Sequence, residues 1–460
     1  MVATTPAVVV AAPSSGSGKT TVATGLVGAL RRAGHRVAPF KVGPDFIDPG
    51  YHALAAGRPG RNLDPVLVSE PRIGPLYRHG CAGADIAVIE GVMGLFDGRI
   101  DPDSVAPAIG STAHVASLLN APALLVVDAS GHSQSIAALL QGFSTFDTRT
   151  RIGGVILNRV GSPRHEQVLR QACQFIGMPV LGAIPRATEL SVPSRHLGLV
   201  TAVEHGGQAR AAVDAMTSLV AQYVDLAAVA ALASANVTAA PWDPVTAVGG
   251  AVDGHPVLAV AAGRAFSFSY AEHHEMLRAA GADVVEFDPT TESLPDGTDA
   301  LILPGGFPEQ YLTELSANTE LRHQIHALAE HAPIYAECAG LTYLMTTLDD
   351  HPMCGVFEGA AYFTKRLTLG YRDAFATVDS VLHPLGHPAV GHEFHRTKVE
   401  FAAAYPPAWT FRVDGVAMHD GAIRNKVHAA YLHTHPAGQP DSVRRFVASA
   451  VPAVAAQPSR

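Results

Sequence analysis

The sequence predicts an α/β protein built from two successive units, each with a parallel sheet covered by helices. Three features carry this prediction: short apolar runs, amphipathic stretches between them, and a change of composition midway along the chain. Apolar runs without polar alternation indicate strands that are buried on both faces, as in parallel sheets. Because such sheets bind ligands beyond the carboxyl ends of their strands, the residues that follow each run are the first candidates for a functional site.

Predicted strands and helices alternate along both halves of the chain. In the first half we expect strands at 7–12, 36–42, 84–92, 121–130 and 152–160, and a helix over 19–34 that ends near Gly34. The second half restarts the pattern, with strands expected at 256–263, 282–287, 300–306 and 332–337 and a helix over 270–281. Between the halves, residues 225–255 change from an Ala-rich stretch to a Pro-, Gly- and Thr-rich connection. We therefore predict one domain at 1–240, a linker at 241–254 and a second domain at 255–450.

Composition argues against several classes of protein. The chain has 460 residues, of which 48% are hydrophobic, which is enough for more than one large core. Its net charge of −9 and its lack of basic runs argue against a nucleic-acid partner. Four scattered cysteines without a CxxC pair argue against a disulfide framework or a zinc cluster and are typical of the cytoplasm. The N-terminal stretch lacks the basic segment and the long apolar run of a signal peptide, so we expect neither a signal nor a membrane span.

A phosphate-binding loop is predicted between the first strand and the first helix. The stretch APSSGSGKTT fits the pattern GxxxxGK[ST], except that Pro13 stands in place of the usual first glycine. Backbone N–H groups of this loop and the helix N-terminus would face phosphate oxygens, Lys19 would reach the outer phosphates, and the Thr20 hydroxyl would bind Mg²⁺. The alternative is an ordinary Ser/Gly-rich loop before a helix. The residues expected to contact ATP are Ser14, Gly16, Ser17, Gly18, Lys19 and Thr20.

Two acidic segments also follow predicted strands. FKVGPDFIDPGYH and VIEGVMGLFDG place carboxylates where a phosphate loop could use them for Mg²⁺ or substrate. We expect Glu90 to be a metal ligand. The alternative for Asp45 and Asp97 is a role in turns, because Pro-Asp and Asp-Gly are common turn pairs. The residues expected to serve the substrate at this site are Lys41, Asp45, Asp48 and Asp97.

A cysteine on a sharp turn is predicted in the second half. In APIYAECAGLTYLM, Cys338 stands among small residues between a strand and a helix, as a nucleophile does at a strand-to-helix elbow. Such a turn would expose the thiol and place it at a helix N-terminus, which lowers a thiol pKa. LPGGFPE offers the N–H groups of Gly305 and Gly306 to an oxyanion, and YLHTHPAG offers His433 and His435 as bases. The alternative is that Cys338 is a small buried hydrophobic residue.

The segment GHEFHRT contains two further histidines and a glutamate, His392, Glu393 and His395. Their spacing matches no standard zinc site. We expect them to have a structural or substrate-contact role.

Together these motifs resemble the cobyrinic acid a,c-diamide synthase family, whose members are also described as hydrogenobyrinic acid a,c-diamide synthases. The resemblance runs nearly end to end. It includes LNRVGS, and KVGPDFIDP with EGVMGLFDG is its most specific part, because cobyric acid synthase lacks that combination. The first half is also similar to dethiobiotin synthetase, and the second to class I glutamine amidotransferases. The resemblance implies a P-loop-type amidoligase domain followed by an α/β glutamine amidotransferase domain.

The resemblance also implies roles for individual residues. It makes Cys338 the nucleophile of glutamine hydrolysis and His433, rather than His435, its base, and it places Asn158 and Arg159 near the adenine. Many class I domains have a glutamate two residues after the histidine; His435 stands there, so the third member of the catalytic group is left open. The implied reaction is amidation of the a and c acetates of a corrin through acyl phosphates, with ammonia passing between two sites along a closed path. The implied cofactors are ATP and Mg²⁺, and the implied partners are glutamine, the corrin and, as one assembly to test, a second copy of the chain.

Two alternatives stay open. One is a related amidoligase that acts on another tetrapyrrole, such as nickel sirohydrochlorin, or on a different carboxylate altogether, and that differs only in its substrate pocket. The other is a ParA-like ATPase that switches partners and carries an inert second half. The ParA-like alternative predicts an amphipathic element for membrane or DNA, which the sequence lacks, and it leaves Cys338 unexplained. The sequence does not decide between a cobalt-containing and a metal-free corrin, the order of the two amidations, or the oligomeric state.

Overall fold

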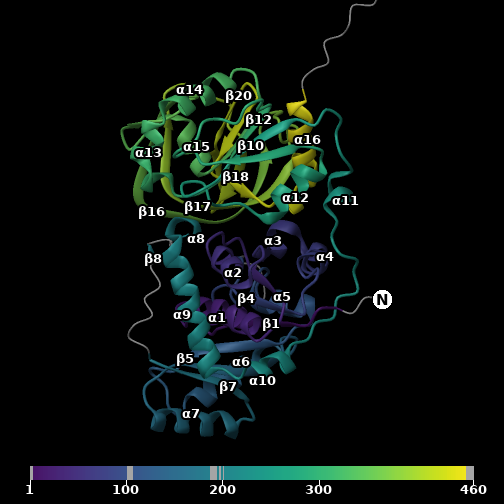
Figure 1. The fold of residues 1–460 in the computed structure, drawn as a ribbon, viewed down its shortest axis with the longest axis vertical. Helices are drawn as coiled ribbons and strands as arrows, with labels where there is room; N and C mark the ends of the chain where they lie inside the picture. Colours follow the sequence, from purple (N-terminus) through teal and green to yellow (C-terminus); the bar gives the residue numbers. More distant parts are fainter. Residues whose placement is uncertain (1–3, 101–106, 187–193, 196–197, 200, 452–460) are drawn as a thin grey trace, which may run out of the picture. The chain divides into compact units, whose positions relative to one another are not determined.

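The computed structural model describes residues 4–100, 107–186, 194–195, 198–199 and 201–451. Its internal contacts divide the chain into two compact units, Met1–Trp242 and Asp243–Arg460. Both units combine parallel strands with helices, as the sequence predicts (Figure 1). Within the described residues, no helix combines the length and the apolar composition needed to cross a membrane.

The N-terminal unit is built on a seven-stranded sheet in the order β3-β2-β4-β1-β5-β6-β7, and every adjacent pair is parallel. Strands β1, β2 and β4 are buried at every position, which explains why they are apolar except for Lys41 in β2 and Glu90 in β4. The prediction missed β3 and β7, of which β3 is only three residues long. The strands are β1 Ala7–Ala11, β2 Val37–Val42, β3 Arg61–Leu63, β4 Ile86–Glu90, β5 Ala123–Asp128, β6 Ile152–Val160 and β7 Val180–Pro185, with a separate pair β8 Ser194–Arg195 and β9 Gly198–Leu199.

Ten helices of the described residues belong to this unit. The first helix follows the predicted phosphate loop and contacts α2 and α9, so a segment from the end of the unit packs against its start (Figure 1). Helix α6 contacts α7 beside the β6–β7 end of the sheet. The helices are α1 Lys19–Arg32, α2 Asp48–Ala56, α3 Pro65–Val68, α4 Glu70–Gly80, α5 Thr112–Leu119, α6 Ile136–Phe146, α7 Pro163–Phe175, α8 Ala202–His205, α9 Gly207–Tyr223 and α10 Leu226–Leu232.

The C-terminal unit has a six-stranded sheet in the order β11-β10-β12-β13-β21-β20. The first five strands are mutually parallel, and β20 is antiparallel to β21 at the edge. This arrangement brings the ends of β12, β13 and β21 to one edge of the sheet. The strands are β10 Val257–Ala261, β11 Asp283–Phe287, β12 Ala300–Leu303, β13 Ile334–Glu337, β20 Ala422–Arg424 and β21 Val427–Ala430.

A second, largely antiparallel sheet in this unit was not predicted from the sequence. Its main pair is β16 with β17, and β14, β15, β18, β19 and β22 extend it. Most positions of β16 are half-buried or exposed, so the strand carries no apolar run that would reveal it. The strands are β14 Met345–Leu348, β15 His351–Pro352, β16 Phe357–Ala376, β17 Pro388–Phe401, β18 Trp409–Val413, β19 Val416–Asp420 and β22 His433–Thr434.

The predicted linker at 241–254 contains a short helix, α11, which contacts α12 and α16 of the C-terminal unit. The helices of this unit are α11 Pro244–Val248, α12 Ala271–Ala279, α13 Leu312–Ala317, α14 Thr319–Leu328, α15 Ala339–Leu344 and α16 Pro440–Ala450, with single 3₁₀ turns η1 Pro308–Gln310 and η2 Pro436–Gly438.

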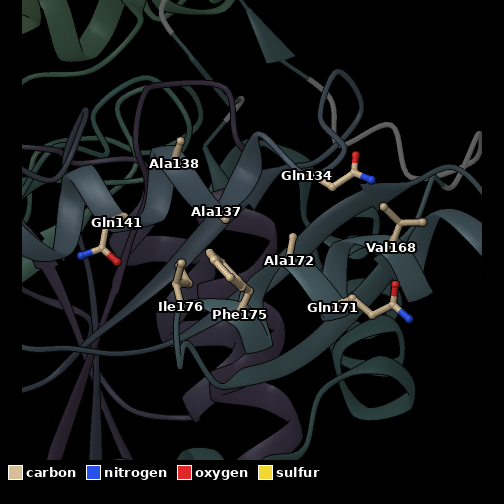
Figure 2. Close-up of a pocket in the computed structure, with 9 residues that line it drawn as sticks. All are labelled: Gln134, Ala137, Ala138, Gln141, Val168, Gln171, Ala172, Phe175 and Ile176. Atoms are coloured by element: carbon tan, nitrogen blue, oxygen red, sulfur yellow. The ribbon is translucent and has the colours of Figure 1, made fainter.

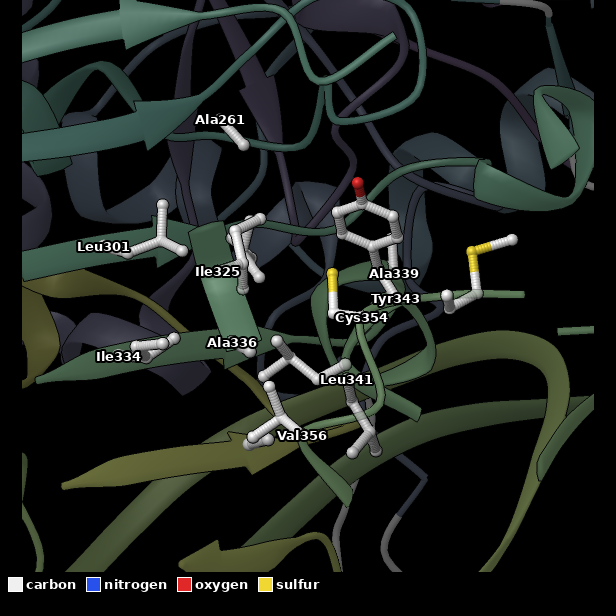
Figure 3. Packing of buried hydrophobic residues seen from close by; sticks show 14 of the residues in the cluster. Ala261, Leu301, Ile325, Ile334, Ala336, Ala339, Leu341, Tyr343, Cys354 and Val356 are labelled. Atoms are coloured by element: carbon white, nitrogen blue, oxygen red, sulfur yellow. The ribbon is translucent and has the colours of Figure 1, made fainter. Parts of the chain in front are cut away.

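A large apolar core holds α15 against the strands that precede it. Figure 3 shows Leu301 of β12, Ile334 of β13 and Leu341 of α15 among its buried members. Burying such side chains stabilises the fold by about 1.5–3 kcal/mol each. Because Cys338 immediately precedes α15, this core fixes the position of the turn that carries the thiol.

Candidate active sites

The predicted phosphate loop lies between β1 and α1. Gly18 caps the helix with a φ of 95°, a left-handed conformation that favours glycine. Lys19 begins α1, and its ammonium donates to the carbonyl of Met93 at 2.5 Å and to that of Ser14 at 3.4 Å. The Ser17 hydroxyl also donates to the Ser14 carbonyl, at 3.0 Å. The loop is therefore closed on itself and joined to the segment after β4.

Asn158 and Arg159 lie near the end of β6, and Asn158 contacts this loop. The Asn158 amide donates to the carbonyl of Ser17 at 2.9 Å, and a Cβ on Gly18 would come within 2.3 Å of the same amide nitrogen. Arg159 has a positive φ of 57° and pairs with Asp128. Asn158 thus holds the loop in shape, a contact that the sequence did not indicate.

Four predicted residues form a compact polar cluster where β2, β4, α1 and α2 meet. The Lys41 ammonium lies 2.6 Å from Asp48 and 3.0 Å from Glu90. The Thr20 hydroxyl donates to Glu90 at 2.6 Å, and it lies 3.4 Å from Asp48. The parallel register of β2 and β4 pairs Lys41 with Glu90, which explains how residues far apart in the sequence meet.

His52, on α2, also belongs to this cluster, although we did not predict it from the sequence. Its Nε2 lies 2.7 Å from the second oxygen of Glu90, and both side chains are buried. One turn of helix separates His52 from Asp48, so α2 presents both side chains to the same place. Nothing in the local sequence GYHALAA marks this histidine, because its partner comes from another strand.

The cluster has more negative than positive charge. Burial, followed by the carboxylates of Asp45 and Glu90, raises the pKa of Asp48 to about 7. Burial alone would raise the pKa of Glu90, but Lys41 and the hydrogen bond from His52 outweigh it and hold that pKa well below its usual range. The Lys41 ammonium thus lies between two carboxylates, those of Asp48 and Glu90, an arrangement that can accept additional positive charge.

Asp45 and Asp97 both accept backbone N–H groups within turns, which is the alternative to a substrate role that the sequence left open for them. One oxygen of Asp45 accepts the N–H groups of Ile47 and Asp48 at 2.7 and 2.9 Å. One oxygen of Asp97 accepts the N–H of Gly94 at 3.0 Å. These contacts shape the two loops on either side of the cluster, and a role in substrate binding stays a prediction.

Cys338 lies on a strained strand-to-helix turn. Its φ of 48° and ψ of −97° are rare for a residue with a side chain. Its N–H donates to the carbonyl of Ala430 at 2.7 Å. Its carbonyl accepts the N–H of Thr342, and this is the first hydrogen bond of the helix. A Cβ on Gly340 would lie 2.2 Å from the Leu303 carbonyl, so only glycine lets α15 approach β12 this closely. This is the geometry of a nucleophile elbow.

One expectation about the thiol is wrong. The sequence led us to expect an exposed Cys338 with a lowered pKa, but the residue is 5% exposed. Burial raises the pKa of the thiol, the carboxylates of Glu309 and Glu337 raise it further, and the hydrogen bond from the Ala339 N–H opposes them without outweighing them. The loss of hydration therefore outweighs the short helix, and the resting thiol is protonated and needs a base.

His433 lies at the same edge of the sheet as Cys338. It follows β21, which pairs with β13 directly before the cysteine. A Cβ on Gly305 would fall 2.4 Å from the ring carbon Cε1 of His433, so the Pro-Gly-Gly loop packs against the imidazole. The ring nitrogen Nδ1 lies 3.3 Å from the carboxylate of Glu337. The second predicted glycine, Gly306, is equally constrained, because a Cβ there would meet the Ala265 carbonyl at 2.1 Å.

The segment GHEFHRT lies on β17, and its polar side chains are buried. Glu393 forms an ion pair with Arg372 at 2.6 Å, and His395 stacks on Tyr431 with ring centroids 3.7 Å apart. Where the structure describes the chain, no group of three or more His, Cys, Asp or Glu side chains could hold a metal ion. Of the two roles expected for this segment, structural or substrate contact, these contacts favour the structural one, and a substrate contact stays a prediction.

A cavity of about 600 Å³ lies apart from these residues, between α6 and α7 (Figure 2). Its lining is apolar apart from three glutamines, Gln134, Gln141 and Gln171, and it includes no ionisable side chain. General acid–base and metal chemistry both need such groups, so this cavity is not a candidate active site.

Comparisons with known proteins agree with this division into two sites. Residues 8–200 match the sequence family described as the CobQ/CobB/MinD/ParA nucleotide binding domain, and residues 257–440 match the CobB/CobQ-like glutamine amidotransferase domain. The chain is 69% identical to a hydrogenobyrinate a,c-diamide synthase of Mycobacterium tuberculosis H37Rv, over 96% of this chain and 98% of that protein. It is 52% identical to a protein of the same name from Streptomyces coelicolor, over 96% and 97% of the two chains. It is 42% identical to a cobyrinate a,c-diamide synthase of Gloeobacter violaceus, over 96% of each.

Proposed function

The chain belongs to the family of hydrogenobyrinate and cobyrinate a,c-diamide synthases, and we propose that it converts the a and c acetates of a corrin into amides, with ATP and glutamine as co-substrates. It is a glutamine-dependent ligase with a nucleotide-binding domain. The proposed substrate is metal-free hydrogenobyrinate, because the relatives with 69% and 52% identity carry that name, whereas the one named for cobyrinate has 42%.

One observation carries this proposal: a single chain has both a phosphate loop beside buried carboxylates and a cysteine on a strand-to-helix elbow. A carboxylate does not react with ammonia in water, because oxide is too poor a leaving group. A phosphate loop can activate that carboxylate, and a cysteine can release ammonia from glutamine. Amide formation from glutamine needs both chemistries, which explains why one protein has both sites.

The polar cluster beside the loop fits Mg²⁺ with ATP. Mg²⁺ prefers oxygen ligands and usually retains phosphate oxygens and waters, so one hydroxyl and one or two carboxylates suffice. Thr20, Glu90 and Asp48 supply such oxygens, because the Thr20 hydroxyl lies 2.6 Å from Glu90 and 3.4 Å from Asp48. When bound, Mg²⁺ would neutralise charge on the phosphates. We propose that Lys19 and the loop N–H groups orient the phosphates and that Lys41 faces the substrate carboxylate.

In the synthetase step, an oxygen of the corrin acetate attacks the γ-phosphorus of ATP, the bond from that phosphorus to the bridging oxygen breaks, and ADP leaves. Ammonia then attacks the carbonyl carbon of the acyl phosphate, and inorganic phosphate leaves as the amide forms. Catalysis here consists of positioning and charge neutralisation, for which the loop and the cationic side chains of Lys19 and Lys41 are suited. We propose that Asp45 and Asp97 act by shaping the two loops that border the substrate.

In the glutaminase step, His433 takes the proton of Cys338, and the sulfur attacks the side-chain carbonyl carbon of glutamine. The N–H groups of Gly305 and Gly306 stabilise the resulting oxyanion. The protonated His433 then gives its proton to the leaving ammonia, and a glutamyl thioester remains. Water hydrolyses the thioester to glutamate and restores the thiol. Ammonia released into bulk water would be protonated and lost, so we propose that it reaches the synthetase site without leaving the protein.

Further parts of the proposal concern organisation. We propose a synthetase domain at 1–240, a linker at 241–254 and an amidotransferase domain at 255–450. We also propose a cytoplasmic location and a homodimeric assembly. Asn158 and Arg159 are proposed to border the adenine, a position supported by the contact of Asn158 with the phosphate loop.

The test is a substrate comparison. Purified protein receives ATP, Mg²⁺ and glutamine with hydrogenobyrinate, cobyrinate or nickel sirohydrochlorin, and mass spectrometry follows amide formation. We expect the diamide of hydrogenobyrinate as the main product. Amidation of nickel sirohydrochlorin alone would favour the related amidoligase, and consumption of neither ATP nor glutamine with any tetrapyrrole would refute the proposal.

A further inference from the structure

His435 occupies the position, two residues after His433, at which many class I domains have a glutamate. This side chain is fully buried and committed elsewhere. Its Nδ1 accepts the N–H of Ala437 at 3.2 Å, its ring stacks on Tyr270 with centroids 4.2 Å apart, and its Nε2 lies 4.0 Å from Glu272. His435 cannot supply the negative charge that a catalytic imidazole uses when it becomes protonated.

A carboxylate reaches His433 from another element. Glu337 is the last residue of β13 and directly precedes Cys338. One of its oxygens lies 3.3 Å from Nδ1 of His433, and the other accepts the N–H of Thr434 at 3.1 Å and the hydroxyl of Tyr335. Its side chain is 12% exposed, so little water competes with these contacts.

Strand pairing explains how the contact arises. Strands β13 and β21 are parallel, and Glu337 stands opposite Ala430. His433 follows Ala430 by three residues, so the chain leaving β21 passes the end of β13 where the carboxylate lies. The same register brings the nucleophile, the base and the carboxylate to one edge of the sheet.

We propose that Glu337 is the positioning residue that holds His433 for glutamine hydrolysis, in place of the glutamate that many class I domains have after the histidine. This inference rests on the proposed glutaminase function. With Nδ1–H committed to Glu337, the lone pair of the imidazole is on Nε2, the nitrogen left to take the Cys338 proton. The imidazolium formed in that step lies beside a carboxylate, which lowers the barrier to the proton transfer.

The electrostatics of the site agree with this role. Burial would raise the pKa of Glu337, but the hydrogen bond and charge of His433, followed by the Tyr335 hydroxyl, outweigh it and lower that pKa, so the carboxylate is charged. Burial and the adjacent Glu337 raise the pKa of Tyr335, which keeps the phenol as a donor. Glu337 also raises the pKa of the Cys338 thiol, so it cannot act by favouring a resting thiolate. Its benefit arises only when His433 carries the proton.

The test compares Glu337→Gln with Glu272→Gln, the matched change in the buried carboxylate nearest His435. Full-length variants are assayed for glutaminase kcat and KM and for diamide formation from ammonia. For Glu337→Gln we expect glutaminase kcat to fall by about 10²- to 10⁴-fold, with KM changed by less than about threefold and ammonia-driven amidation retained. Glu272→Gln should stay within about threefold of wild type.

Glu337→Asp keeps the charge and shortens the side chain by one methylene, so we expect a smaller loss than in Glu337→Gln. This variant tests the role even if Glu337→Gln fails to fold. The inference is overturned if Glu337→Gln keeps glutaminase kcat within about threefold of wild type, or if Glu272→Gln loses as much. It is also overturned if Glu337→Asp is no better than a folded Glu337→Gln. Failure of the proposed function has a separate signature, a wild-type protein that hydrolyses no glutamine.

Discussion

Removing the cation from the polar cluster should destabilise the N-terminal unit in a pH-dependent way. Lys41→Met deletes contacts of 2.6 Å to Asp48, 3.0 Å to Glu90 and 3.3 Å to the Gly91 carbonyl. Breaking a buried pair by removing one partner costs about 3–5 kcal/mol, because the other charge stays buried without its counter-ion. For a unit of this size that corresponds to a fall in Tm of about 6–20 °C.

The sign of the pH dependence follows from Asp48. Its pKa in the fold is raised to about 7 from 3.8, so the protonated carboxyl is favoured in the native state. Stability from such a group is fully present below the unfolded pKa and is lost as pH rises through the folded one. Without the Lys41 ammonium, the charged form of Asp48 is more costly in the fold, so the stability lost as pH rises should be larger in Lys41→Met than in wild type. We therefore expect the full loss of about 3–5 kcal/mol at pH 8 and at most about half of that loss at pH 5.5.

The assay is urea unfolding followed by tryptophan fluorescence. The chain has two tryptophans, of which Trp242 belongs to the N-terminal unit and Trp409 to the C-terminal unit, so a Trp409→Phe background reports the N-terminal unit. Arg36→Met, which breaks a surface ion pair with Asp85, is the control and should leave the midpoint unchanged. Lys41→Met/Asp48→Asn should recover most of the stability at pH 8. Equal destabilisation at pH 8 and pH 5.5, or no recovery in the double variant, would refute the reasoning.

Three further predictions concern the two sites. Glu90→Gln removes the negative charge of the carboxylate that accepts from the Thr20 hydroxyl and from Lys41, and we expect ammonia-driven amidation to fall by about 100-fold or more while glutaminase kcat is unchanged; equal loss of both would contradict separate sites. Gly340→Ala places a Cβ 2.2 Å from a backbone carbonyl and should lower unfolding free energy by about 1–3 kcal/mol, whereas Gly142→Ala, in open space on α6, should raise it by up to about 1 kcal/mol. Because burial raises the pKa of Cys338, iodoacetamide without glutamine should modify it at pH 7.5 at least about tenfold more slowly than free cysteine; rapid labelling located by mass spectrometry would show an exposed thiolate.

The sequence was sufficient to predict residues whose place in the site follows from their position at the end of a strand. Lys41 and Glu90 lie at the carboxyl ends of apolar strands, and parallel strands bring such ends to one edge, so their meeting could be predicted before the structure. The elbow at Cys338 was predictable for a similar reason, because small residues between an apolar strand and a helix indicate a tight turn.

Contacts between distant segments could not be predicted in this way. His52 has no local signal, and Glu337, although adjacent to Cys338, meets His433 only because β13 pairs with β21. The burial of Cys338 depends on packing by the whole core around α15, which local turn chemistry does not reveal. The antiparallel sheet was missed because most positions of β16 are half-buried or exposed and the strand has no apolar run.

The central claim is that Cys338 releases ammonia from glutamine for an ATP-dependent amidation elsewhere in the same chain. The most direct measurement is diamide formation by Cys338→Ala with glutamine or ammonia as the nitrogen source, in the presence of ATP, Mg²⁺ and hydrogenobyrinate. We predict that the variant forms no diamide from glutamine and forms it from ammonia at the wild-type rate. Glutamine-driven diamide formation by the variant, or loss of both reactions in a folded variant, would contradict the claim.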